Sequence, residues 1–138
     1  MRVYISGKIG EAVISEATRQ KFAKAEKMLE AKGYEVFNPT IVAWENKLRG
    51  DFRIYRYQQP NSDKVKFYAY ALLRDMMVLA TCEAIYMLPD FLDSKGAKAE
   101  HAFAIATGKK VYYAEELFAN GTLRREYNSR GVLPEVAR

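Results

Sequence analysis

An early segment of the chain reads Arg2-Val3-Tyr4-Ile5-Ser6-Gly7-Lys8-Ile9-Gly10 (residues 2–10). Val3, Tyr4 and Ile5 are β-branched or aromatic, and two glycines follow closely after Ser6, which predicts a buried strand over 2–6 that leaves through a glycine turn. From about residue 15 to residue 32, apolar side chains recur every three or four positions with charges between them. This spacing predicts an amphipathic helix, and Gly33 stands where its C-terminal cap belongs. The segment is therefore typical of the first unit of an α/β fold.

The same alternation continues along the chain. We expect further strands over 34–37, 84–88 and 110–113, helices over about 63–81 and 94–106, and a helical fragment near 115–119. The order predicts a Rossmann- or flavodoxin-like α/β fold, with an open parallel sheet of four or five strands and helices on both faces. Ligands of such sheets bind at the carboxyl ends of the strands, near the point where the strand order reverses.

Length and composition predict one globular domain over residues 1–138. About half of the 138 residues are hydrophobic (49%) and 28% are charged, which suits a chain with a packed core. The segment over about 40–63 has no clear period but holds several aromatic side chains, and we interpret it as a long active-site loop. The residues from about 120 to 138 form a polar tail.

Charge and cysteine content narrow the classes of function. Lys plus Arg is 22 and Asp plus Glu is 17, and the formal net charge of +5 suits an anionic ligand or a nucleic acid. The basic residues are interspersed with acidic ones, which favours solvated helix faces over a nucleic-acid patch. Cys82 is the only cysteine, no apolar run reaches roughly 18 residues, and the first residues do not resemble a secretory signal. We therefore expect a cytoplasmic protein without a membrane span.

The turn after the first predicted strand is one candidate binding site. Gly7 lets backbone amides approach a ligand closely, and Lys8 adds a positive charge. The turn lacks the sequence of a Walker A loop and of a GxGxxG loop. Ser6, Gly7, Lys8 and Ile9 therefore either bind an anionic ligand or form an ordinary strand-to-helix turn.

The start of the helix over 94–106 is the second candidate. Ser94 suits the N-cap, and Gly96 leaves the first amides of the helix accessible, which is the arrangement of an anion site. Glu100 follows Gly96 by four residues and shares its helix face. As a carboxylate in the first turn of the helix it should have a lowered pKa, so that an ionised carboxylate is available as a nucleophile. The alternative is a glutamate that only balances Lys98 and the helix dipole.

Other polar residues have open interpretations. Asp75 stands among apolar helix positions, where burial would raise its pKa as a general acid requires, but Arg74 beside it permits a surface ion pair. His101 has no cysteine or second histidine with which to complete a metal site, so we expect a structural role and no metal. Asp90 and Asp93 could bind a ribose hydroxyl.

In combination, these motifs resemble the nucleoside 2-deoxyribosyltransferase superfamily, in particular its small bacterial and phage members. The similar features are Tyr4-Ile5-Ser6-Gly7 at the first strand, Asp75 before the third, and Ser94-x-Gly96-x3-Glu100 after it, and the resemblance covers roughly residues 1–113. It implies that Glu100 attacks the anomeric carbon, displaces the nucleobase and forms a glycosyl-enzyme ester. It also implies that Asp75 handles the proton of the departing base, and that the Tyr4 hydroxyl holds the nucleophile. Water or a second base then takes the sugar.

The pair Ser94 and Gly96 implies a narrower substrate class. Transferases of free nucleosides often carry an aspartate at the place of Ser94. The arrangement here is similar to the 2′-deoxynucleoside 5′-phosphate N-hydrolases, in which these residues hold the phosphate, although Lys8 stands where that branch has serine. The resemblance implies a nucleotide or nucleoside as partner and a homo-oligomer, either a dimer or larger. The sequence gives no reason to expect a cofactor.

Three hypotheses about function remain open at this point. The chain is an enzyme acting on N-glycosidic bonds, a non-catalytic nucleotide-binding or sensing module of the same fold, or a basic protein associated with nucleic acid. The first accounts for the motifs, whereas the third rests on the pI near 9.3 and the aromatic content alone. We therefore expect nucleic acid not to be the partner.

Overall fold

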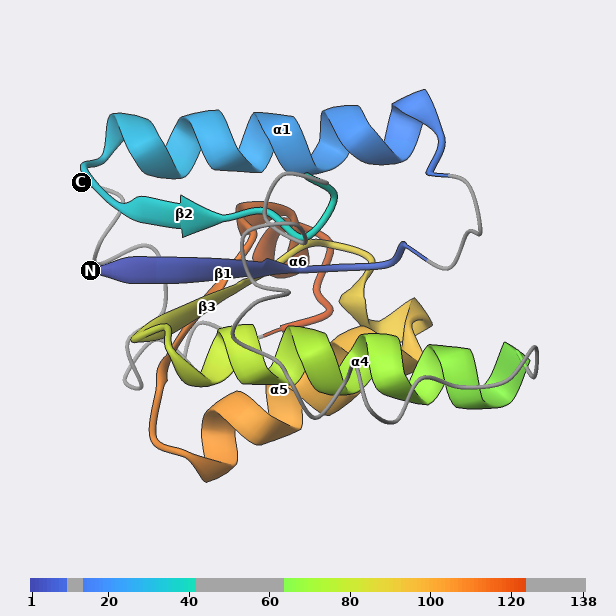
Figure 1. Ribbon diagram of the computed structural model, residues 1–138. Coiled ribbons are helices and arrows are strands. Elements are labelled where there is room, and N and C mark those ends of the chain that lie inside the picture. Colours follow the sequence, from blue (N-terminus) through green and yellow to red (C-terminus); the bar gives the residue numbers. More distant parts are fainter. Residues whose placement is uncertain (10–13, 42–63, 124–138) are drawn as a thin grey trace.

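The computed structural model describes residues 1–9, 14–41 and 64–123 (Figure 1). In chain order the elements are β1 (Arg2–Ser6), α1 (Glu16–Ala31), β2 (Glu35–Phe37), α4 (Lys64–Ala80), β3 (Ala84–Met87), the short 3-10 helix η1 (Phe91–Asp93), α5 (Lys95–Ala106), β4 (Lys110–Tyr113) and α6 (Glu115–Ala119). Nearly all of the expected loop over 40–63 and most of the expected tail lie outside the described residues. No described helix is both long enough and apolar enough to span a membrane.

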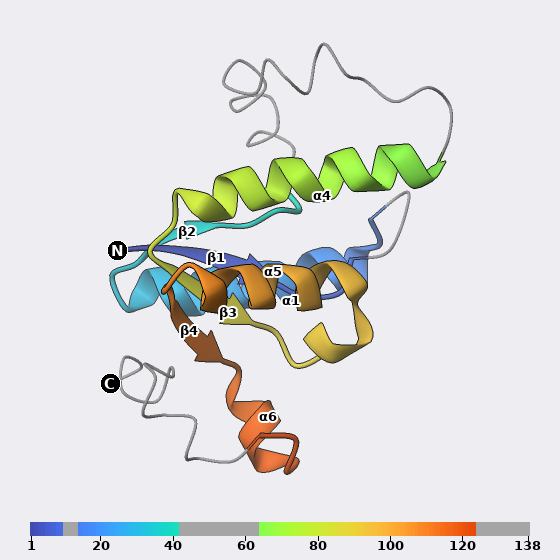
Figure 2. The same ribbon diagram turned by 90° about the horizontal axis from the view of Figure 1, so that it is seen from below.

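The four strands form one parallel sheet in the order β2-β1-β3-β4. The chain moves from β1 to β2 on one side and then crosses back to β3 on the other, so the strand order reverses between β1 and β3. Helix α1 covers one face, while α4 and α5 pack against each other on the opposite face (Figures 1 and 2). The predicted Rossmann- or flavodoxin-like open parallel sheet is confirmed, with four strands among the described residues.

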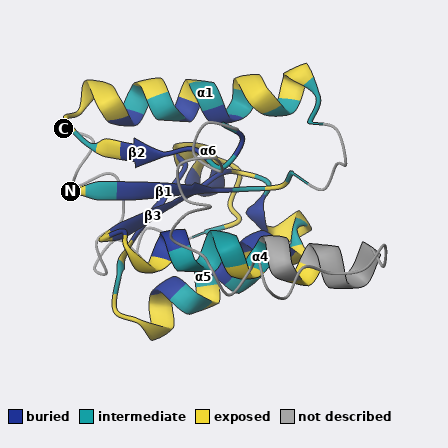
Figure 3. Ribbon diagram, viewed as in Figure 1, coloured by how far each residue is buried: buried dark blue, intermediate teal, exposed yellow. Residues whose placement is uncertain are grey.

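Helix α1 shows why the sequence pattern predicts its element well. Ser15 caps the helix by accepting a hydrogen bond from the Thr18 backbone N–H at 3.2 Å. Phe22 and Leu29 are buried on the side that faces the sheet, and the outer side is exposed (Figure 3). Gly33 follows the helix with φ of +92°, a conformation that residues with a Cβ rarely adopt.

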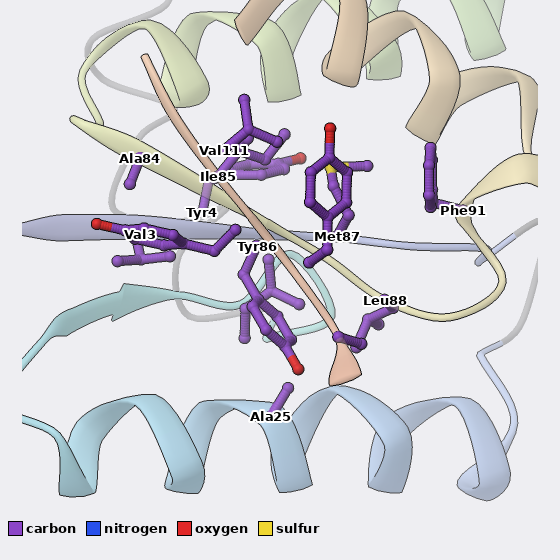
Figure 4. Close-up of a cluster of buried hydrophobic side chains, with 14 of the residues drawn as sticks. Val3, Tyr4, Ala25, Ala84, Ile85, Tyr86, Met87, Leu88, Phe91 and Val111 are labelled. Carbon is purple, nitrogen blue, oxygen red and sulfur yellow. The ribbon is translucent and has the colours of Figure 1, made fainter. Parts of the chain in front are cut away.

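The core lies on both faces of the sheet. Figure 4 shows Tyr86 pointing toward Ala25 of α1, while Tyr4 and Ile85, which are register partners on β1 and β3, lie on the opposite face. Tyr4 is fully buried, and its ring stacks on Phe37 with the ring centroids 5.3 Å apart. A buried tyrosine needs a hydrogen-bond partner for its hydroxyl. That partner is supplied by α5.

Candidate active site

Helix α5 carries the predicted nucleophile into the interior. Ser94 is its N-cap, as predicted, and accepts a hydrogen bond from the Ala97 backbone N–H at 3.1 Å. The helix begins at Lys95, so Glu100 lies in the second turn, on the face with buried Gly96 and Ala97. This face packs on the sheet, and only 6% of Glu100 is exposed.

Both carboxylate oxygens of Glu100 accept a hydrogen bond from β1. The Tyr4 hydroxyl donates to Oε2 at 2.6 Å, and the Ser6 hydroxyl donates to Oε1 at 2.6 Å. These lengths fit O–H donors on an ionised carboxylate. Tyr4 and Ser6 are two residues apart on a strand, so their side chains emerge on the same face. The strand therefore holds the carboxylate at two points and fixes its orientation.

Sequence reasoning missed the contact between Ser6 and Glu100. It grouped Ser6 with Gly7, Lys8 and Ile9 as ligand-binding residues, whereas the structure directs the Ser6 hydroxyl to the carboxylate. The available signal was the spacing of two between Tyr4 and Ser6, which puts two hydroxyls on one strand face. We interpret Ser6 as a second residue that holds Glu100.

The predicted lowering of the Glu100 pKa is wrong. Burial first, and then the charge of Asp75, raise the pKa to about 8, and the hydrogen bonds from Ser6 and Tyr4 offset only part of that rise. The prediction failed because the helix dipole acts mainly within the first turn, whereas Glu100 lies in the second turn and is desolvated against the sheet.

We expect Glu100→Gln to flatten the pH dependence of folding stability. An unfolded glutamate ionises near 4.5, while folded Glu100 ionises at about 8. Between these values the folded state keeps a proton that the unfolded state has lost. The stability contributed by protonated Glu100 is thus complete below about pH 4.5 and is lost as the pH rises through 8, at no more than about 1.4 kcal/mol per pH unit. Denaturant unfolding of both proteins across this range measures the effect, and equal slopes would contradict it.

Asp75 lies on α4, close enough for its charge to act on the site. It raises the pKa of Glu100, and it contributes to raising the pKa of Tyr4 well above its usual value near 10, although burial is the larger cause for both. Its side chain is 22% exposed and forms an ion pair with Arg74 at 3.5 Å. The carboxylate of Asp75 therefore pairs with Arg74 and also acts through its charge on Glu100 and Tyr4.

The turn after β1 is held by the loop after β3. The Lys8 backbone N–H donates to Asp90 Oδ1 at 3.1 Å, so this amide already has a partner within the protein. The Lys8 side chain is exposed, and Ile9 packs partly against the core. The second oxygen of Asp90 pairs with Lys21. Asp90 therefore fixes the turn within the folded chain.

Gly7→Ala should destabilise the fold by about 1–3 kcal/mol, which is the usual cost of overpacking. A β-carbon at this position would lie 2.6 Å from Leu88 Cδ1, 2.9 Å from Leu88 Cβ and 3.1 Å from Asp90 Oδ1. Denaturant unfolding measures the loss. Because Leu88→Ala removes the closest atom, the penalty of Gly7→Ala should be smaller in that background. Equal penalties in both backgrounds would show that this contact is not the cause.

Two further candidate residues from the sequence analysis are His101 and Asp93. The ring Nε2 of His101 and the Tyr113 hydroxyl form a hydrogen bond of 2.8 Å, the ring packs near Phe91, and burial lowers the pKa of His101. Asp93 is exposed at the end of η1. Within the described part of the chain, no group of three or more His, Cys, Asp or Glu side chains is arranged to hold a metal ion.

Comparison with known proteins gives a family for most of the chain. Residues 1–113 match the family described as "Domain of unknown function (DUF4406)", and the chain therefore belongs to that family. The matched region ends with β4 and contains every residue of the candidate site. No curated protein matches the chain.

Proposed function

We propose that this member of the DUF4406 family cleaves or transfers the N-glycosidic bond of a nucleoside or nucleoside 5′-monophosphate, with Glu100 as nucleophile. The observation that carries the proposal is the Glu100 carboxylate, which is buried, held on both oxygens by Tyr4 and Ser6, and close to the charge of Asp75. A glutamate with no chemical role would be costly in this position, because burial disfavours its ionised form. The resemblance of the motifs to nucleoside 2-deoxyribosyltransferases supplies the substrate class.

The two carboxyl groups divide the reaction between them. An oxygen of Glu100 forms a bond to the anomeric carbon as the bond from that carbon to the base nitrogen breaks, and the electron pair of the broken bond leaves with the base. Asp75 gives its proton to the base. Water or a second base then attacks the anomeric carbon, Glu100 leaves as a carboxylate, and Asp75 takes a proton from the attacking group. This is the retaining chemistry of two-carboxylate glycosidases.

The raised pKa of Glu100 supports this division. Burial first, and then the nearby charge of Asp75, raise the pKa of Glu100 to about 8, so Glu100 holds a proton near neutral pH in the free protein. The hydroxyls of Tyr4 and Ser6 donate to Glu100 and favour its ionised form. For the reaction this proton has to pass from Glu100 to Asp75, from which it is given to the departing base.

A nucleotide is favoured over a free nucleoside by the start of α5. The Ser94 oxygen accepts from the Ala97 N–H, and its own hydroxyl hydrogen can be donated to an anion. The backbone N–H groups of the first helix turn also favour an anion. The resemblance of Ser94-x-Gly96 to the 5′-monophosphate hydrolases supports the same assignment.

Ser94→Asp tests this assignment, because aspartate is an equally good N-cap but repels a phosphate. The KM for a 5′-monophosphate should rise at least about tenfold, which corresponds to 1.4 kcal/mol. The free nucleoside, which lacks the phosphate, serves as the matched substrate, and its KM should change little. An equal rise for both substrates would place the phosphate elsewhere.

Release of free base is the direct test of the proposed function. The protein is incubated with deoxynucleosides, ribonucleosides and their 5′-monophosphates, with and without a second base as acceptor, and the products are separated by chromatography. Free base or an exchanged nucleoside from one class supports the proposal. Saturable nucleotide binding with no product would favour the sensing module, and steeply salt-dependent binding to DNA or RNA would favour the nucleic-acid hypothesis. The resemblance also favours a homo-oligomer, which light scattering measures.

A further inference from the structure

A second polar cluster joins three segments near the carboxyl ends of β1 and β3. Asp90 accepts the Lys8 N–H with one oxygen and pairs with Lys21 through the other. The Lys21 ammonium also donates to the Lys8 backbone carbonyl at 2.9 Å. We call this arrangement of Lys21, Asp90 and the Lys8 main chain the clasp. It ties the turn after β1 to the loop after β3 and to the second turn of α1.

The clasp lies next to the residue that holds the nucleophile. Ser6 is bound through its backbone carbonyl to the Leu88 N–H at 2.8 Å, and two residues later both main-chain groups of Lys8 are bound by the clasp. Gly7, between them, fits closely against Leu88 and Asp90. The backbone directly after the Ser6 side chain is thus fixed on both sides of Gly7.

We propose that Asp90 and Lys21 are positioning residues that act on Glu100 through Ser6, a role that rests on the proposed function of Glu100. Here the carboxylate and the ammonium each use one of their interactions on Lys8, and those contacts fix the position from which Ser6 reaches Glu100. Neither residue touches the reacting atoms.

The effect of breaking the clasp can be measured as a change in the pKa of Glu100. Among the described residues, the groups that act on its ionisation are Tyr4 and Ser6 from β1 and Asp75 from α4. Of these, only Ser6 adjoins the clasp. If the clasp is broken, the turn moves, the hydrogen bond from Ser6 weakens, and the pKa of Glu100 should rise further, because that bond lowers it.

The test compares Asp90→Ala and Lys21→Met with Glu35→Ala. The control breaks the pair between Arg2 and Glu35, which is 3.3 Å long and lies at the other end of β1. The protein is labelled with carbon-13 at the glutamate carboxyls, the Glu100 signal is assigned with Glu100→Gln, and its pKa is read by NMR titration. Base release is measured in parallel.

Both clasp variants should raise the pKa of Glu100 by about half a unit to one unit and lower kcat about tenfold with little change in KM. Glu35→Ala should change neither, and Lys21→Arg, which keeps the charge, should restore most of the loss. An unchanged Glu100 pKa with a lower melting temperature would overturn the proposal, since the pair would then only stabilise the fold. If Asp90→Ala does not fold, Lys21→Met alone is the test, because it removes the contact with the Lys8 carbonyl.

The NMR measurement separates this inference from the proposed function. A protein that releases no base but shows the shifted Glu100 pKa would retain the clasp as a device that positions Glu100, and the proposed reaction alone would fail. A protein that releases base but shows no shift in the clasp variants would retain the reaction, and the clasp proposal alone would fail.

Discussion

Glu100→Gln is expected to reduce the release of base at least about 10³-fold, because the amide cannot form the ester with the anomeric carbon. Glutamine has nearly the size of glutamate, so the packing of α5 on the sheet should survive. The hydroxyls of Tyr4 and Ser6 both donate to the carboxylate, whereas an amide offers one acceptor oxygen. One of the two hydroxyls must therefore reorient, and this change is confined to the site.

Two measurements identify the cause of this loss. Rapid denaturation of the wild-type protein during turnover should trap a species heavier by one sugar, or one sugar phosphate, and Glu100→Gln should not give it. The matched control is Glu30→Gln, which makes the same chemical change at an exposed position on α1. Turnover by Glu100→Gln at a rate near that of the wild type would end the assignment of Glu100 as nucleophile.

The elements of the fold could be predicted because each one is encoded locally. The period of apolar residues gives α1, and Gly33 and Gly108, both with positive φ, mark the ends of α1 and α5. The short strands are runs of apolar residues, and their alternation with helices permits few arrangements other than a parallel sheet. The observed bounds of β1 and β4 coincide with the predicted ranges.

The environment of Glu100 could not be predicted in the same way. Its partners Tyr4 and Ser6 are 96 and 94 residues away in the sequence, and only the packing of α5 on β1 brings them together. Its ionisation depends on burial against that strand and on a carboxylate from α4, and neither follows from its place in its own helix. The helix-dipole argument considers only α5, whereas the pKa of Glu100 depends on its burial and on residues of β1 and α4.

The contacts of the clasp could not be predicted from the sequence either. From the sequence alone, Asp90 is a loop residue that could bind a ribose hydroxyl, and Lys21 is an ordinary charged residue on a helix. Their side chains meet because the loop after β3 returns beside the turn after β1. This contact also changes the interpretation of the glycine turn, because the Lys8 amide that appeared suited to a ligand is used within the protein.

Asp75→Asn is expected to lower kcat about 10²- to 10³-fold, since the asparagine side chain cannot protonate the departing base. The same substitution removes a charge that raises the pKa of Glu100. The rising limb of the pH profile of kcat/KM should therefore move to lower pH, while burial still keeps the pKa of Glu100 above its usual value. A lower rate combined with earlier ionisation of the nucleophile distinguishes a lost acid from a disturbed site.

Two substrates whose leaving bases differ in their need for a proton test whether Asp75 acts as the acid. A nucleoside of 7-methylguanine carries a positive charge on its base, which departs without taking a proton, so Asp75→Asn should lose far less activity on it than on an ordinary purine nucleoside. Arg74→Gln is the matched control, because it breaks the ion pair with Asp75 and keeps the carboxylate. It should lose little activity on either substrate, since an ion pair of partly exposed side chains contributes little. Equal losses of Asp75→Asn on both substrates would mean that Asp75 acts on Glu100 through its charge alone, and the proton of the departing base would then have to come from another group.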